Sequence, residues 1–217
     1  MRVRLWFALC LTEILFTMPL QAGPPLLPVP CEDWEGKPVT LERLKEKVTV
    51  VISSNRETMD VGAEVDRDLL YHFGSNQNFT LIRVADLRNV PYLARDIVIS
   101  TIKARDRAEL IELKERFAAD GQTASLQSTV FYVLDWQGKF GRAMLQASPL
   151  TEYSLFKRDP SRLTRFEKDR VERERQKLAD HLHVFVLDQK GDVRGHYLDR
   201  GAARQAIPSI RGLLPPT

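Results

Sequence analysis

The sequence holds two cysteines, Cys10 and Cys31, which are its candidates for nucleophilic or redox chemistry. A cysteine reacts as the thiolate, whose formation is favoured by a helix N-terminus, a metal or a nearby cationic side chain. Cys31 follows a proline-rich stretch, residues 23–30, and lies far from the nearest predicted helix start, near Asp60. The sequence therefore favours an inert, packed thiol at Cys31. A reactive Cys31, acting as a peroxidatic thiol or in a mixed disulfide with a partner, is the alternative hypothesis.

A polar loop follows the β-branched run at residues 48–53. Ser54, Asn55 and Arg56 come directly after this predicted strand and precede a predicted helix. In α/β sheets, ligands bind beyond the carboxyl ends of the strands, where free backbone N–H groups at a helix start attract anions. We therefore expect these residues to form a candidate ligand loop for a small anionic ligand or a peptide carboxylate, with Arg56 supplying positive charge. An ordinary loop without a ligand is the alternative.

Two histidines, His181 and His183, stand two residues apart on a predicted strand, so their side chains are expected to share one face. Two imidazoles on one face can begin a metal site, but a structural site usually needs four ligands. The other histidines, His72 and His196, are isolated in the sequence, and no cysteine cluster completes a ligand set. The sequence therefore predicts surface or edge-strand histidines, with no metal and no cofactor.

Net charge and charge patterning limit which classes of binding partner the sequence suggests. The chain carries 32 Lys and Arg residues against 29 Asp and Glu residues, a net charge of +3, which does not suggest a nucleic-acid-binding protein. Between Lys157 and Lys177 basic residues outnumber acidic ones, and the two signs are interleaved. That interleaving favours a solvent-exposed helix with spaced ion pairs. A docking helix for an acidic partner or for membrane headgroups is the alternative.

The N-terminus has the pattern of a secretory signal peptide. Basic residues precede an apolar run that begins at Leu5, and Ala22 ends a cleavage site. Cleavage of residues 1–22 leaves a periplasmic or secreted chain with no stable membrane span. An acidic residue interrupts the apolar run, and an uncleaved anchor is the alternative. Cleavage also removes Cys10, and a single remaining thiol cannot form an internal disulfide.

Apolar periodicity places the elements that would position these residues. The run at 48–53 is β-branched and nearly continuous, which is typical of a strand buried on both faces. A strand at 79–85 and a helix at 106–117 follow later, while residues 92–104 fit a helix or a strand equally. Residues 60–74 form a predicted helix with one apolar stripe, made of Val61, Val65, Leu69 and Phe73.

Two segments, 131–138 and 184–191, have the same pattern of a strand followed by Asp-x-x-Gly. Asp bonds the backbone of such a turn and Gly accepts a positive φ, so each segment predicts a β-hairpin. The return strands are expected at 139–145 and 192–197, with an inserted helix at 157–180 between the hairpins and a last helix at the end of the chain. Strands that alternate with helices and end antiparallel predict an α/β protein with a mixed sheet between helices.

Three motifs occur in a fixed order along the chain: Gly36-Lys37-Pro38-Val39-Thr40-Leu41, then Lys47-Val48-Thr49-Val50-Val51, then the 184–191 hairpin before the last helix. This order resembles the thioredoxin-like superfamily, in the branch with peroxiredoxins and periplasmic thiol-disulfide proteins, and the doubled hairpin pattern resembles the YtfJ family most. The resemblance implies a thioredoxin-like three-layer sandwich with a central mixed sheet, an extra hairpin and an inserted charged helix. It implies an N-terminal arm and hairpin at 23–47 and a domain at 48–217 with the helical insertion 157–180.

The chain departs from that superfamily at the redox site. In the redox members a Cys-x-x-Cys begins the first helix, and here those positions fall on Arg56 and Met59, which form no thiolate. The superfamily's cis-proline, expected near Ser128 or Leu182, is missing as well. The resemblance with these departures implies a non-catalytic secreted or periplasmic binding module for an unknown protein or small anionic ligand. A thiol-dependent peroxidase or mixed-disulfide protein that uses Cys31 alone is the alternative.

Overall fold

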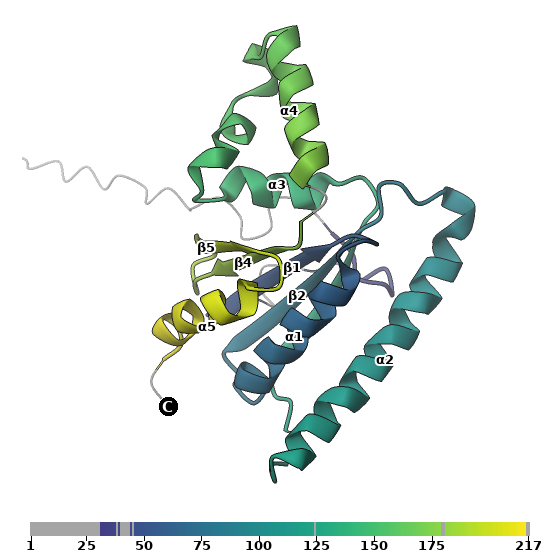
Figure 1. The fold of residues 1–217 in the computed structure, drawn as a ribbon, viewed down its shortest axis with the longest axis vertical. Coiled ribbons are helices and arrows are strands. Elements are labelled where there is room, and N and C mark those ends of the chain that lie inside the picture. The colour runs from purple at the N-terminus through teal and green to yellow at the C-terminus, as the bar shows by residue number, and fades with distance from the viewer. Residues whose placement is uncertain are drawn as a thin grey trace, which may run out of the picture.

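A computed structural model describes residues 31–37, 39, 44, 46–123, 125–178 and 181–215. Its strands are β1 (Val48–Ser54), β2 (Phe79–Asp86), β3 (Thr129–Asp135), β4 (His183–Leu187) and β5 (Val193–Leu198). They form one sheet in the order β3-β2-β1-β4-β5 (Figure 1). β1 is parallel to β2, and β2 is parallel to β3, whereas β4 is antiparallel to both β1 and β5.

Helices cover both faces of this sheet. The α-helices are α1 (Met59–Phe73), α2 (Arg95–Ala119), α3 (Lys139–Ala147), α4 (Arg165–Leu178) and α5 (Ala202–Leu213). Among the described residues there are also the 3-10 helices η2 (Tyr92–Ala94), η3 (Thr151–Lys157) and η4 (Pro160–Arg162). A β1–α1–β2 unit and a β4–β5–α5 unit share the sheet, as the resemblance to thioredoxin-like proteins implies. The expected fold class, α/β with a central mixed sheet between helices, is confirmed.

The two faces of the sheet bury separate apolar cores. Successive residues of a strand point to opposite faces, so Val50 enters the core under α1, α2 and α5, and Val51 enters the core under α3 and η3. Both side chains are fully buried, which explains the continuous apolar run of β1. The predicted stripe of α1 lies in the first core, where Val65, Leu69 and Phe73 are buried and Val61 is partly buried.

The second Asp-x-x-Gly segment forms the predicted hairpin. Asp188 Oδ1 accepts hydrogen bonds from the backbone N–H groups of Lys190 (2.9 Å) and Asp192 (3.0 Å), and Gly191 has φ +87°. β4 and β5 pair through this turn.

The hairpin expected after the first Asp-x-x-Gly is wrong, because residues 139–147 form α3 instead of a return strand. Asp135 Oδ2 accepts a hydrogen bond from Gly141 N–H at 2.9 Å, within the first turn of the helix. Phe140, Ala143 and Met144 are buried on one helical face. Their spacing of three and four residues is the helical signal that the shared turn motif obscured.

The ambiguous stretch at 92–104 is helical. It forms η2 and the first turns of α2, which then continues through the predicted 106–117 helix. Leu113 and Phe117 in the C-terminal half of α2 are buried in the first core, whereas Ile97 near its start is 68% exposed. In Figure 1, α2 lies beside α1 on the face of the sheet toward the viewer.

α4 lies within the predicted insertion and stands away from the sheet (Figure 1). Thr164 and Glu167 form a capping box: Glu167 Oε2 accepts from Thr164 N–H at 2.9 Å, and Thr164 Oγ1 accepts from Glu167 N–H at 3.3 Å. Phe166 is 72% exposed. These contacts fit a solvated helix that is stabilised locally.

The predicted signal peptide, residues 1–22, lies outside the described residues, as do Cys10 and most of the N-terminal arm. The turn at 34–37 is described: Val39 N–H donates to Cys31 C=O at 3.0 Å, and Asp33 N–H donates to Lys37 C=O at 2.9 Å. Within the described ranges no helix combines the length and apolar character that a membrane span needs.

Candidate functional site

The carboxyl ends of β1 and β2 open into a cavity of about 810 Å³. Ser54 is the last residue of β1, Asn55 and Arg56 follow it, and Met59 is the first residue of α1. All four line the cavity, together with Gly62 and Ala63 of α1, residues 84–91 at the end of β2 and in the loop after it, and the N-terminal half of α2. The candidate ligand loop and the positions at which the resemblance places redox cysteines, Arg56 and Met59, therefore border one cavity. We refer to it as the α1–α2 cavity.

The loop before α1 binds its own backbone N–H groups. Asn55 Oδ1 accepts from the N–H groups of Glu57 and Thr58, both at 2.9 Å, and Thr58 Oγ1 accepts from Asn55 N–H at 3.0 Å. The expectation of free N–H groups for an anion is wrong at these three positions. Arg56 is exposed and forms no ion pair with the described residues.

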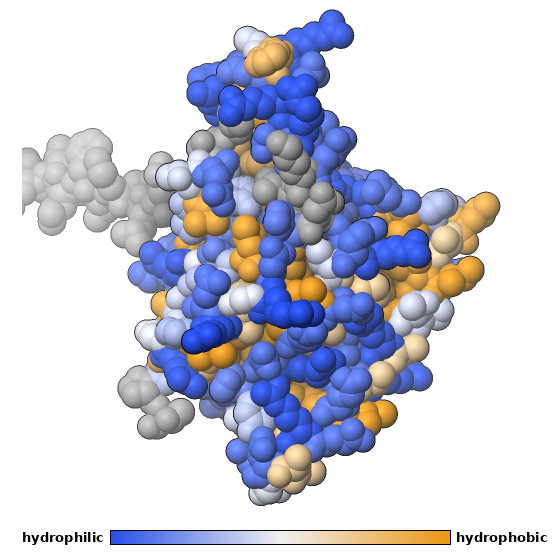
Figure 2. All heavy atoms as spheres, in the orientation of Figure 1, coloured by the Kyte–Doolittle hydropathy of each residue, from blue (hydrophilic) through white to orange (hydrophobic). Residues whose placement is uncertain are grey.

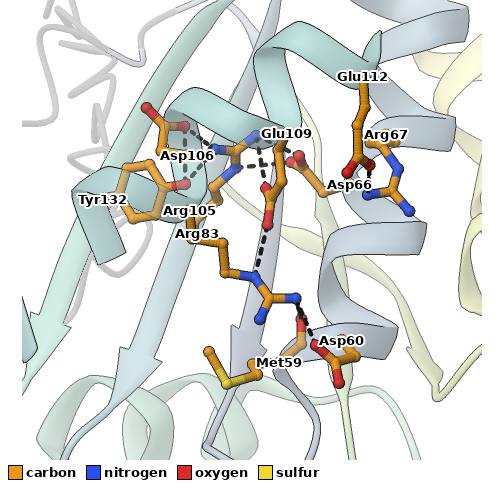
Figure 3. A network of polar contacts seen from close by, with 10 residues as sticks. All are labelled: Met59, Asp60, Asp66, Arg67, Arg83, Arg105, Asp106, Glu109, Glu112 and Tyr132. Carbon is orange, nitrogen blue, oxygen red and sulfur yellow. Dashed lines mark hydrogen bonds and ion pairs between the residues drawn. The ribbon is translucent and has the colours of Figure 1, made fainter. Parts of the chain in front are cut away.

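A network of ionic and polar contacts lies between α1, α2 and the sheet (Figure 3), and Arg83, Asp66 and Glu109 of this network line the cavity. Arg83 of β2 faces α1 and α2, and its Nε and Nη2 atoms donate to the two carboxylate oxygens of Asp66 on α1. Arg83 Nη1 donates to Asp106 of α2 and to the Tyr132 hydroxyl on β3. Tyr132 in turn donates to Asp106 Oδ1 at 3.0 Å. One guanidinium thus joins two strands and two helices.

Arg105 and Glu109 extend this network along α2 toward the start of α1. Arg105 Nε donates to Glu109 Oε1 at 3.0 Å, and Arg105 Nη2 donates to Asp60 Oδ1 at 2.7 Å and to Met59 C=O at 3.3 Å. Glu109 Oε2 lies 3.9 Å from Arg83 Nη2, beyond hydrogen-bond length. Glu109 is 8% exposed and lines the cavity.

Burial shifts the ionisation of these groups. It raises the pKa of Asp66 to about 6, although Arg83 acts in the opposite direction. Burial alone would lower the pKa of Arg83, but Asp66 and the other acidic neighbours hold it above its ordinary value. Burial also raises the pKa of Tyr132. At neutral pH Arg83 is therefore charged and Tyr132 is neutral. The pKa of Asp66, about 6, lies close to neutral pH.

Cys31 does not lie at the start of α1. It is partly buried against the second core, on the α3 side of the sheet, whereas α1 packs on the first core. Burial, with a smaller contribution from Asp135, raises the pKa of the Cys31 thiol to about 11. A thiol of that pKa is almost entirely protonated at neutral pH and is a weak nucleophile.

The histidines are arranged differently from the prediction. His181 precedes β4 instead of lying within it, and its Nδ1 contacts Asp199 Oδ2 at 2.8 Å. His183 is 7% exposed on a strand with neighbours on both sides, and the prediction of surface or edge-strand histidines is wrong for it. His183 Nδ1 lies 3.0 Å from His196 Nε2, and His196 Nδ1 lies 2.8 Å from Ser148 Oγ.

This buried chain of side chains packs in the second core, where Tyr153 lies 4.9 Å from His196 between ring centroids. Burial, and then the neighbouring His183, lower the pKa of His196 to about 3, so the ring is neutral. Within the described ranges, no group of three or more His, Cys, Asp or Glu side chains could hold a metal ion.

Sequence reasoning missed the residues of the ionic network. Arg83 stands in the middle of an otherwise apolar strand, and a long cation at such a position needs a buried partner. That signal was present. The partners were harder to find, because Asp66 and Glu109 come from two helices separated by a strand and a loop.

No protein-family model matches the sequence, and no curated protein sequence matches it. Similar solved structures include StoA from Bacillus subtilis (13% identity, 82% of this chain and 91% of StoA, TM-score 0.44). Another is the bacterioferritin comigratory protein of Xanthomonas campestris, studied for alkyl peroxide reduction (12% identity, 86% of this chain and 92% of that chain, TM-score 0.43). A third is MTB DsbF, in mixed oxidized and reduced forms (14% identity, 87% of this chain and 97% of that chain, TM-score 0.44). At these identities and TM-scores the likeness carries no argument about activity.

Proposed function

We propose that this protein is a non-catalytic, secreted or periplasmic binding module on a thioredoxin-like scaffold, and that its ligand occupies the α1–α2 cavity. The observation that supports this most is the position of the cavity, which borders Arg56 and Met59. These are the positions at which the resemblance places redox cysteines. The cavity volume of about 810 Å³ falls within the range of about 300–1,000 Å³ that is typical of small-molecule sites.

The proposed compartment follows from the signal-peptide pattern of residues 1–22.

The alternative function, thiol chemistry at Cys31 alone, has less support. The Cys31 thiol is half-buried and belongs to the opposite side of the sheet from α1. Its raised pKa, about 11, leaves little thiolate to attack a peroxide or a disulfide. Because the alternative makes a distinct prediction, catalysis is tested first.

Wild-type protein and the Cys31→Ser variant are compared for insulin-disulfide reduction and for hydrogen-peroxide consumption. We expect both proteins to match a protein-free blank in both assays. Insulin reduction at a rate comparable to that of a thioredoxin would refute the proposal. Peroxide consumption that the Cys31→Ser change abolishes would support the alternative.

Binding in the cavity is tested with Nile red, a neutral apolar dye whose fluorescence rises when it leaves water. The Ala94→Trp change places a large ring into the cavity from the N-terminal end of α2. Ala118→Trp is the matched control, because Ala118 is exposed near the other end of the same helix. We expect wild type and Ala118→Trp to bind the dye and Ala94→Trp to lose binding. Equal binding by all three proteins would show that the cavity is not the site.

A further inference from the structure

The charged side chains of α4 are sorted between two faces of the helix, although their signs are interleaved in the sequence. Val171 packs against the second core and marks the inner face. Among the α4 side chains that the structure describes, the exposed charges are four cations and one carboxylate: Arg165, Lys168, Arg170, Arg173 and Asp169. The carboxylates of Glu167, Glu172 and Glu174 are partly buried instead. The outer surface of α4 therefore carries a net positive charge.

The partly buried carboxylates of α4 already have partners in the chain. Glu167 Oε1, for example, accepts from Arg158 Nη1 at 2.8 Å. Arg165, Arg170 and Arg173 form no ion pair with any described residue. A guanidinium group is charged at every physiological pH, so these three arginines can bind an anionic partner outside the chain.

Phe166 stands among these cations. Its side chain is 72% exposed, and Arg170 and Arg173 follow it at spacings of four and seven residues, which share one helical face. In Figure 1, α4 projects away from the sheet, and Figure 2 shows a hydrophilic surface over it, at the top of the view, interrupted by a small apolar area. An exposed aromatic ring surrounded by basic residues is typical of helices that lie on membrane surfaces.

We infer that the outer face of α4 binds the surface of a membrane that contains anionic lipids, with Phe166 at the boundary between headgroups and acyl chains and the arginines at the lipid phosphates. Arg165 and Arg173 lie about 12 Å apart along the helix axis, so they can contact more than one headgroup. Guanidinium groups bind phosphate oxygens through two parallel N–H donors. The inference is independent of the α1–α2 cavity, which is lined by other elements.

An acidic protein would use the same arginines, but Phe166 favours a membrane. The ring gains free energy when it leaves water, and the interfacial layer of a bilayer accepts an aromatic side chain wherever it is presented. A protein partner would need a pocket placed opposite this ring. The arginines alone do not distinguish the two partners, so the ring provides the decisive test.

Binding is measured by sedimentation with vesicles of phosphatidylglycerol and phosphatidylcholine in equal parts, and with vesicles of phosphatidylcholine alone. We expect the wild type to bind the anionic vesicles more tightly at low salt, and to lose this preference at about 1 M salt, where the Debye length is about 3 Å. Residues 1–30 are identical in every variant, so any binding through the N-terminus is common to all of them.

The combined change Arg165→Gln, Arg170→Gln and Arg173→Gln removes three charges from the outer face. We expect it to weaken binding to anionic vesicles about a hundredfold, at roughly fivefold for each arginine near the surface. The matched control removes three exposed cations of α2 and α5: Arg107, Lys114 and Arg204. This control has the same net charge and should bind nearly as tightly as the wild type, and melting temperatures establish that both variants fold. Equal losses in the two variants, or no preference of the wild type for anionic vesicles, would overturn the inference.

Phe166→Ser separates a membrane from an acidic protein. We expect it to weaken binding to anionic vesicles about tenfold and to leave binding to poly-L-glutamate, an acidic polypeptide, unchanged. Leu93→Ser is the matched control and should not change vesicle binding, because Leu93 is 92% exposed on η2, outside α4. Unchanged vesicle binding by Phe166→Ser, or binding of the wild type to poly-L-glutamate but not to anionic vesicles, would indicate an acidic protein partner and contradict the inference. Nile red binding is a separate outcome that tests only the proposed function of the cavity.

Discussion

Helix α1 packs against α5 on one side and against α2 on the other, and the two contacts are built differently. On the α5 side, Ala202, Ala206 and Ile210 are fully buried against the first core. On the α2 side, apolar burial is limited to Leu113 and Phe117 in the C-terminal half of the helix.

Nearer the start of α2, the contact with α1 and the sheet is made by the Arg83 network and the ion pairs of Arg105. The cavity lies on this side. Aliphatic packing closes the space between two helices because it fills volume from every direction. Ion pairs fix the distance between helices at a few points and leave room between them. Ion pairs therefore fix the N-terminal half of α2 at a distance from the sheet at which the cavity stays open.

Removing the central cation tests this comparison most strongly. The Arg83→Met change leaves the buried Asp66 without its counter-charge, and should lower the free energy of unfolding by about 3–5 kcal/mol. Chemical denaturation of both proteins measures the difference. Combining Arg83→Met with Asp66→Leu should restore part of the loss, because the second change removes the carboxylate that lost its partner. A loss below about 1 kcal/mol for Arg83→Met would mean that the network does not hold α2.

An isoleucine-to-alanine pair compares the two sides of α1 directly. Ile210→Ala removes a fully buried side chain on the α5 side, and should cost about 2–5 kcal/mol. Ile97→Ala removes a side chain that is 68% exposed on the cavity wall, and should change stability by no more than about 0.5 kcal/mol. The same Ile97→Ala protein should bind Nile red more weakly, because Ile97 lines the cavity. Equal losses of stability would show that the N-terminal half of α2 packs as tightly as α5.

The smallest effect concerns pH. Because the folded pKa of Asp66, about 6, lies above the ordinary value of 3.8, the folded protein binds the extra proton between these values. The contribution of Asp66 to stability is therefore fully present below pH 3.8 and is lost as pH rises through about 6. The slope is at most about 1.4 kcal/mol per pH unit, the value for one proton.

The difference in unfolding free energy between the wild type and Asp66→Asn, measured from pH 4 to 7, isolates this contribution. Asp68→Asn is the control, since Asp68 is half-exposed and pairs with Arg116 at the surface. A pH-independent difference for Asp66→Asn would show that Asp66 ionises as freely in the folded as in the unfolded chain.

Local patterns in the sequence predicted most of the fold. The apolar run of β1, the stripe of α1 and the Asp188 turn each depend on neighbours within a few residues, and each is present as expected. The same kind of pattern misled at residues 139–147. Asp135 can stabilise a turn before a return strand or before a helix. Only the burial of Phe140 and Met144 against the sheet selects the helix there.

The site was predicted only in outline. Chain order alone places residues 54–56 at the carboxyl edge of the sheet and Met59 at the start of α1, because β1 leads directly into that helix. That no cysteine stands at Arg56 or Met59 is likewise visible in the sequence. The α1–α2 cavity and its ionic network were not, since they depend on how far α2 stands from the sheet.

By itself, the sequence determined the order of most strands and helices, apart from residues 92–104 and 139–147, and excluded a cysteine pair at the start of α1, because both follow from residue identity and short-range periodicity. Only the tertiary structure decided that Cys31 packs on the opposite side of the sheet, and that Arg83 meets Asp66, Asp106 and Glu109. Charges distant in sequence become partners through the packing of helices on a sheet, and no local pattern records the distance between them.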